Sequence, residues 1–123
     1  MRKISSLAIY TLLLCATNAP AQGISTIQIE KIFHANSLSG IVTFGDVKQR
    51  VVPGALVEEC SPKWAEIIAS TRTDENGSFK LPITSHASIH YLRISTSGAN
   101  PLLVRVKLDS KSHGLVLNLQ PST

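Results

Sequence analysis

The sequence has few of the residues that usually build disulfides or reactive centres. It contains two cysteines, one methionine and one tryptophan, and aromatic residues make up only 5% of it. Cys15 lies in the apolar N-terminal stretch, so Cys60 would be the one cysteine left in a processed chain and could form no disulfide within it. We expect Cys60 to be buried as a small apolar residue rather than to pair between chains.

No apolar run reaches the length of a comfortable membrane crossing. The longest run, around residues 7–16, follows Met1-Arg2-Lys3 and precedes Ala19-Pro20-Ala21. A positive start, a short apolar stretch and a small-x-small site are together typical of a cleaved signal peptide. We therefore predict cleavage after Ala21, a secreted or periplasmic location, and a mature chain of 102 of the 123 residues without a membrane span. A short uncleaved anchor is the alternative.

Clustered positive charge is also missing. Cleavage would remove Arg2 and Lys3 and lower the formal net charge from +4 to +2, and the remaining basic residues are scattered. Nucleic-acid-binding proteins usually carry a basic stripe interleaved with aromatic residues. The sequence therefore argues against a nucleic-acid partner.

Patterns typical of enzymes and metal sites are weak or absent. His86 and His90 would share one face of a helix, but on an extended chain they lie about 13 Å apart, too far for one metal ion. We therefore expect ordinary surface or rim histidines. Glu58 and Glu59 are neighbours, so on a strand they point to opposite faces and cannot act on one bond, and we expect solvated carboxylates. The sequence predicts no catalytic residue, no metal and no cofactor.

Short stretches of alternating apolar and polar residues fill the rest of the chain, with turn residues between them. This pattern predicts an all-β fold, a seven-stranded antiparallel β-sandwich of Ig-like architecture. The expected strands cover residues 40–44, 55–60, 67–73, 79–83, 89–96, 102–108 and 115–120. A helix over residues 64–70 is the competing interpretation of one stretch. The sandwich domain is expected at residues 39–120, whereas residues 22–38 could form a linker, an edge strand or a flexible tail.

The strongest turn signal is Asp74-Glu75-Asn76-Gly77, between two of these predicted strands. Asn76 and Gly77 adopt positive φ at little steric cost, and Asn-Gly between two strands is typical of a β-hairpin. We expect Asp74 to hydrogen-bond its own turn backbone. Asp74, Asn76 and Gly77 are therefore predicted to be structural residues.

Several short stretches of the sequence, taken together, resemble those of a known family. They are Gly40-Ile41-Val42, Val52-Pro53-Gly54-Ala55-Leu56-Val57, Thr73-Asp74-Glu75-Asn76-Gly77-Ser78-Phe79, and Tyr91-Leu92-Arg93-Ile94-Ser95 followed by Gly98. The chain is similar to the carboxypeptidase regulatory-like domain, a small transthyretin-like (prealbumin-like) sandwich. The resemblance implies an extracytoplasmic accessory domain, here standing alone, and related sandwich families include carbohydrate-binding modules.

We therefore predict a non-catalytic binding or interaction module that contacts a protein partner. A carbohydrate-binding module that uses an exposed aromatic residue is the alternative, and a small hydrolase ranks below both. Trp64 is the first candidate contact residue, although it could instead cover one end of the core. Tyr91 and Arg93 are weaker candidates, since the tyrosine could simply cover the sandwich. The partner's identity and the oligomeric state stay open.

Overall fold

The computed structural model describes residues 26–46 and 50–122. This part of the chain forms nine strands, one short 3₁₀ turn and no α-helix. The elements are β1 (Ile27–Ala35), β2 (Ser39–Phe44), β3 (Arg50–Val51), β4 (Leu56–Cys60), η2 (Pro62–Trp64), β5 (Ile67–Arg72), β6 (Ser78–Lys80), β7 (His90–Ser95), β8 (Leu102–Leu108) and β9 (Leu115–Leu119). The predicted signal peptide lies outside the described residues.

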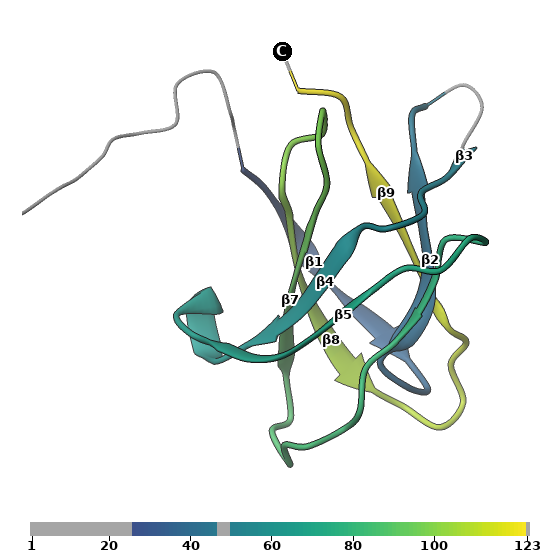
Figure 1. The fold of residues 1–123 in the computed structure, drawn as a ribbon. Coiled ribbons are helices and arrows are strands. Elements are labelled where there is room, and N and C mark those ends of the chain that lie inside the picture. The colour runs from purple at the N-terminus through teal and green to yellow at the C-terminus, as the bar shows by residue number, and fades with distance from the viewer. Residues whose placement is uncertain (1–25, 47–49, 123) are drawn as a thin grey trace, which may run out of the picture.

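The strands pack as two sheets in a sandwich-like arrangement (Figure 1). One sheet has five strands in the order β1-β8-β7-β4-β5. In the other sheet β9 pairs along one side of β2, and β3 and β6 pair one after the other along its other side. The predicted all-β, sandwich-like fold is confirmed at this level, and β5 replaces the helix that was considered near residues 64–70.

Strand number and strand direction differ from the prediction. The described chain has nine strands rather than seven, because β1 and the two-residue β3 were not predicted with the rest. β1 runs parallel to β8, and β9 runs parallel to β2, so both sheets are mixed rather than antiparallel. β1 is an edge strand, which was one of the three alternatives left open for residues 22–38. Alternation within a strand says which face is buried, but it carries no information about the direction of the neighbouring strand.

The turn at residues 74–77 has the predicted hydrogen bonds, but only Gly77 of the two residues expected to favour positive φ adopts it, and Asn76 does not. The N–H of Gly77 donates to the carbonyl of Asp74 at 3.0 Å, and Gly77 has a φ of 75°. Oδ1 of Asp74 accepts the backbone N–H groups of Asn76 at 2.8 Å and Ser78 at 3.0 Å. The prediction that Asp74 bonds its own turn is therefore confirmed.

The prediction of a β-hairpin around this turn is wrong. β5 pairs with β4 in the five-stranded sheet, whereas β6 pairs with β2 in the other sheet. Thr73 still bonds the start of β4, through its N–H to the carbonyl of Ala55, while the carbonyl of Gly77 already accepts the N–H of Val42 in β2. The turn is thus a corner between the two sheets, because the strands on either side of it pair with strands of different sheets.

The core lies between the sheets and is formed by alternate residues of their strands. In β7 and β8 every second side chain is buried, as expected for strands with one face inside and one outside. The largest fully buried apolar side chains are Leu38, Val42, Val57, Leu92, Ile94, Val104, Val106, Leu117 and Leu119. The remaining side chains of β4 and β7 form the outer face on which the candidate site lies.

Candidate functional site

The outer face of the five-stranded sheet brings together the three residues predicted to make contacts. Tyr91 and Arg93 alternate with buried residues of β7, so both point outward and lie half-buried. Trp64 comes from η2, which follows the neighbouring strand β4, and its ring lies against that of Tyr91. We call these three residues together with Glu58 the outer-face cluster.

Trp64 is held by contacts of its ring. The ring centroids of Trp64 and Tyr91 are 5.0 Å apart with an interplanar angle of 89°, an edge-to-face arrangement that aromatic pairs favour. Nε1–H of the indole donates to the carbonyl of Leu92 at 2.9 Å. The side chain is half-buried. Trp64 therefore packs on the outside of β7 rather than over an end of the core.

The backbone that carries Trp64 is strained. Lys63 has a φ of 61° and Trp64 a φ of 55°, left-handed values that cost an ordinary L-residue about 1–2 kcal/mol each. Two hydrogen bonds close the turn: Ser61 N–H donates to the Glu66 carbonyl at 2.8 Å, and Glu66 N–H donates to Ser61 Oγ at 2.9 Å. Such strain persists only where the surroundings hold it in place, and it is common at binding sites.

Arg93 forms an ion pair with Glu58. Its Nε donates to Glu58 Oε1 at 2.9 Å, and this hydrogen bond raises the pKa of Arg93. The Arg93 side chain is 36% exposed, whereas that of Glu58 is only 8% exposed. The prediction of a solvated Glu58 is therefore wrong, because β7 places Arg93 directly opposite it in the sheet. The guanidinium is the more accessible half of the pair.

The inner face of the same two strands carries a second, buried pair. Nδ1 of His90 and Oε2 of Glu59 share a hydrogen bond of 2.7 Å, and both side chains are 1% exposed. The second oxygen, Glu59 Oε1, is also buried and has no hydrogen-bond partner among the described residues. The pair therefore lies in the interior of the sandwich, almost completely shielded from solvent.

The buried pair corrects two predictions. His90 is not a surface or rim residue, and Glu59 is not solvated, although His86 is exposed as predicted. The opposite orientation of Glu58 and Glu59 is confirmed, because one bonds Arg93 outside and the other bonds His90 inside. A signal was present in the sequence: alternation places Glu59 on the inner face with Val57, as it places His90 with the buried residues of β7.

Cys60 is 3% exposed, which confirms the predicted burial. Burial raises the pKa of its thiol, so the residue behaves as a small apolar side chain at neutral pH.

Within residues 26–46 and 50–122 no three His, Cys, Asp or Glu side chains lie close enough together to hold a metal ion. The same residues contain no helix that is both long and apolar enough to cross a bilayer. No protein-family model matches the chain, and no curated protein matches it. The functional argument therefore rests on the geometry of the outer face.

Proposed function

We propose that this protein is a non-catalytic binding module that is exported, loses residues 1–21, and contacts a protein partner through the outer-face cluster. The observation that carries the proposal is the convergence of Trp64, Tyr91 and Arg93 on one face. Tryptophan, tyrosine and arginine are the residue types most enriched among those that dominate binding energy at protein interfaces.

The cluster is preorganised. The indole is fixed by its hydrogen bond to the Leu92 carbonyl and by the ring of Tyr91, and Arg93 is fixed by Glu58. A side chain that is already ordered loses little conformational entropy on binding, which favours affinity. The closed turn at residues 61–66 supports the same interpretation, since it keeps the strained backbone of Trp64 in place.

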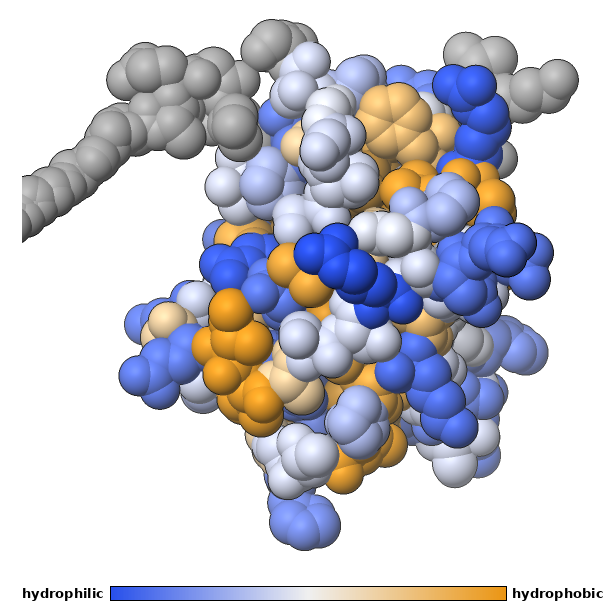
Figure 2. All heavy atoms as spheres, viewed as in Figure 1, coloured by the Kyte–Doolittle hydropathy of each residue, from blue (hydrophilic) through white to orange (hydrophobic). Residues whose placement is uncertain are grey.

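Apolar surface continues beside the cluster. Ile67 and Ile68 begin the edge strand β5 and are 55% and 47% exposed. Figure 2 shows apolar surface next to η2 and the start of β5, bordered by hydrophilic residues. An apolar centre with a polar rim is the usual anatomy of a protein interface.

The edge-to-face geometry favours a protein partner over a glycan. Because the two rings stand at 89° to each other, they do not form one flat platform on which neighbouring sugar rings could stack. A carbohydrate-binding module that uses Trp64 is the second candidate. We also propose, from the sequence resemblance, that the chain is a transthyretin-like sandwich of the carboxypeptidase regulatory-like kind. The two-sheet architecture supports this only at the level of a sandwich-like fold.

The proposal is tested by cross-linking in the exporting cell, followed by capture of the full chain. We expect a cross-linked protein partner with the wild type and with Val116→Ala, and its loss with Trp64→Ala. Val116 is the matched control because it is an exposed apolar residue, 58% accessible, on the other sheet. Circular dichroism of each variant checks that the fold is kept.

Two outcomes would contradict this proposal. One is a partner that is captured equally well by Trp64→Ala and the wild type. The other is a saturable change in the fluorescence of Trp64, the one tryptophan of the chain, on titration with oligosaccharides, which would favour the carbohydrate alternative.

A further inference from the structure

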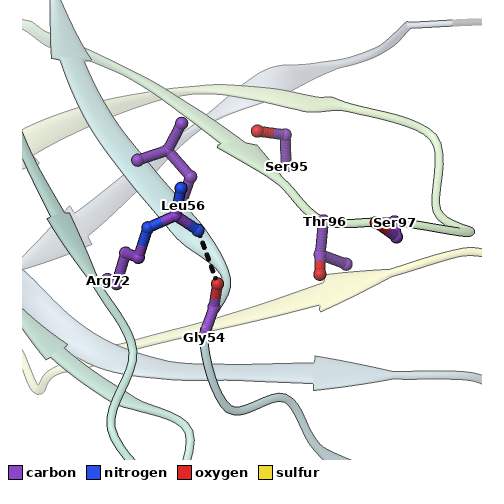
Figure 3. Close-up of a pocket in the computed structure, with 6 residues that line it drawn as sticks. All are labelled: Gly54, Leu56, Arg72, Ser95, Thr96 and Ser97. Carbon is purple, nitrogen blue, oxygen red and sulfur yellow. Dashed lines mark hydrogen bonds between the residues drawn. The ribbon is translucent and has the colours of Figure 1, made fainter.

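A cavity of about 430 Å³ opens at the other end of the outer face, where β4, β5 and β7 lie side by side. It is lined by Gly54, Leu56, Arg72, Ser95, Thr96 and Ser97. The strand register creates this group, because Leu56 lies opposite Arg72 on one side and opposite Ser95 on the other. Figure 3 shows Arg72 on one side of Leu56 and the three hydroxyl residues on the other.

The cavity has a positive charge that no carboxylate neutralises. Arg72 Nη1 donates to the Gly54 carbonyl at 2.9 Å, which orients the guanidinium and leaves four of its five N–H donors for other partners. Arg72 makes no ion pair with any described residue. Two carboxylates lie two residues away along the chain, Glu58 from Leu56 and Asp74 from Arg72. Both already have partners, since Glu58 bonds Arg93 and Asp74 bonds its own turn. None of the six lining residues is acidic.

A second, more apolar hollow of about 370 Å³ adjoins this cavity and shares Thr96 and Ser97 with it. Its other lining residues are Phe44, Arg50, Val51, Val52 and Pro53. A ligand that spans Thr96 and Ser97 would therefore meet the Arg72 guanidinium and hydroxyl groups on one side. On the other side it would meet mainly apolar carbon, with the Arg50 side chain as the one charged group of the lining.

We propose that this double cavity binds a carboxylate that is attached to an apolar group, supplied by a segment of the partner protein. A guanidinium matches a carboxylate with two parallel hydrogen bonds, and the hydroxyls of Ser95, Thr96 and Ser97 supply further donors. The apolar group enters the hollow beside Val51 and Val52. The proposal rests on the proposed function and specifies the chemistry of the partner. A C-terminal carboxylate and an acidic side chain next to an apolar residue share this chemistry.

The test is a titration of the ¹⁵N-labelled protein, purified from the exporting host, with small carboxylates followed by NMR. N-acetyl-leucine represents a chain terminus, and N-acetyl-aspartyl-leucinamide represents an acidic side chain beside leucine. We expect saturable millimolar binding with shifts at the amides of Gly54, Ser95 and Ser97. The better of the two compounds identifies the source of the carboxylate. The neutral N-acetyl-leucinamide should bind at least about tenfold more weakly, because it lacks the charge that Arg72 recognises.

Arg72→Gln should weaken binding of the preferred carboxylate about tenfold or more, whereas Lys80→Gln should leave it unchanged. Lys80 is the matched control, since it is an exposed cation on β6 that does not line either cavity. Val51→Ser should weaken the binding of N-acetyl-leucine but not that of acetate, because only N-acetyl-leucine has a side chain that fills the apolar hollow.

Equal shifts with N-acetyl-leucine and its amide, or equal behaviour of Arg72→Gln and Lys80→Gln, would overturn the proposal. Glucuronate that binds as tightly as N-acetyl-leucine would also overturn it, since the apolar hollow would then contribute nothing. The two proposals can fail separately. If the carboxylates bind as expected but Trp64→Ala still captures the cross-linked partner, the carboxylate site is retained and the proposed role of the outer-face cluster is rejected.

Discussion

At the level of single residues, the strand positions of β4 decide the role of each acidic side chain. Glu58 faces outward to a half-exposed arginine, and Glu59 faces inward to a buried histidine. A buried pair of ionisable side chains adds little net stability, because taking both groups out of water offsets most of their attraction. A single buried charge without its partner is strongly destabilising for the same reason. The inner pair therefore constrains what His90 and Glu59 can be replaced by.

We expect His90→Ala to lower the free energy of unfolding by about 3–5 kcal/mol, since it leaves Glu59 buried and unpaired. The double variant Glu59→Leu with His90→Leu should recover most of this loss, because an apolar pair needs no hydrogen bonds. His86→Ala, at an exposed position, should change stability by less than about 0.5 kcal/mol. Urea unfolding measures all three. A double variant no more stable than His90→Ala would show that the pair is not the cause.

At the level of elements, the turn at residues 74–77 shows which features the local sequence can predict and which it cannot. Asp74 and Gly77 determine the backbone of the turn through hydrogen bonds and a positive φ that can be predicted from the residue types alone. Whether the two flanking strands pair with each other depends on distant partners, β4 for one and β2 for the other. The turn was therefore predictable, and the corner between two sheets was not.

Gly77→Ala should destabilise the protein more than Gly98→Ala. Both glycines have positive φ, 75° and 80°, so each alanine pays a strain of about 1–2 kcal/mol. Only at residue 77 would the new Cβ also lie 2.8 Å from Val51 Cβ, whereas at residue 98 no atom lies within 4 Å. We expect a further loss of about 1–3 kcal/mol for Gly77→Ala, measured as the shift in the urea midpoint. Equal losses would mean that β3 moves away without penalty.

At the level of the whole molecule, the last strand completes the four-stranded sheet. β9 follows β8, which belongs to the other sheet, and pairs in parallel with β2 along residues 40–44. Its side chains alternate between the core and the surface: Leu117 is 1% exposed and its neighbour Val116 is 58% exposed. Contacts between strands so far apart in sequence form the interior on which the whole fold depends.

Leu117→Ala should lower the free energy of unfolding by about 2–5 kcal/mol, because it removes a fully buried side chain and leaves a cavity. Val116→Ala, one residue away on the opposite face, should change it by less than about 0.5 kcal/mol. Chemical unfolding of the two variants side by side checks the inward and outward assignment of β9. Equal effects would contradict a buried interface between β9 and the five-stranded sheet.

By itself the sequence determined the positions of most strands, the face that each strand buries, the conformation of the Asp74 turn and the burial of Cys60. These features depend on residue type and on alternation over a few positions, which are local properties. Only the tertiary structure decided that β1 pairs in parallel with β8 and β9 with β2, and that Glu59 meets His90. It also decided that Trp64 lies on Tyr91 and that Arg72 and three hydroxyl residues line one cavity around Leu56. Each of these arrangements joins segments distant in sequence. It is selected because it buries the most apolar surface with its polar groups paired, and that is a property of the whole chain.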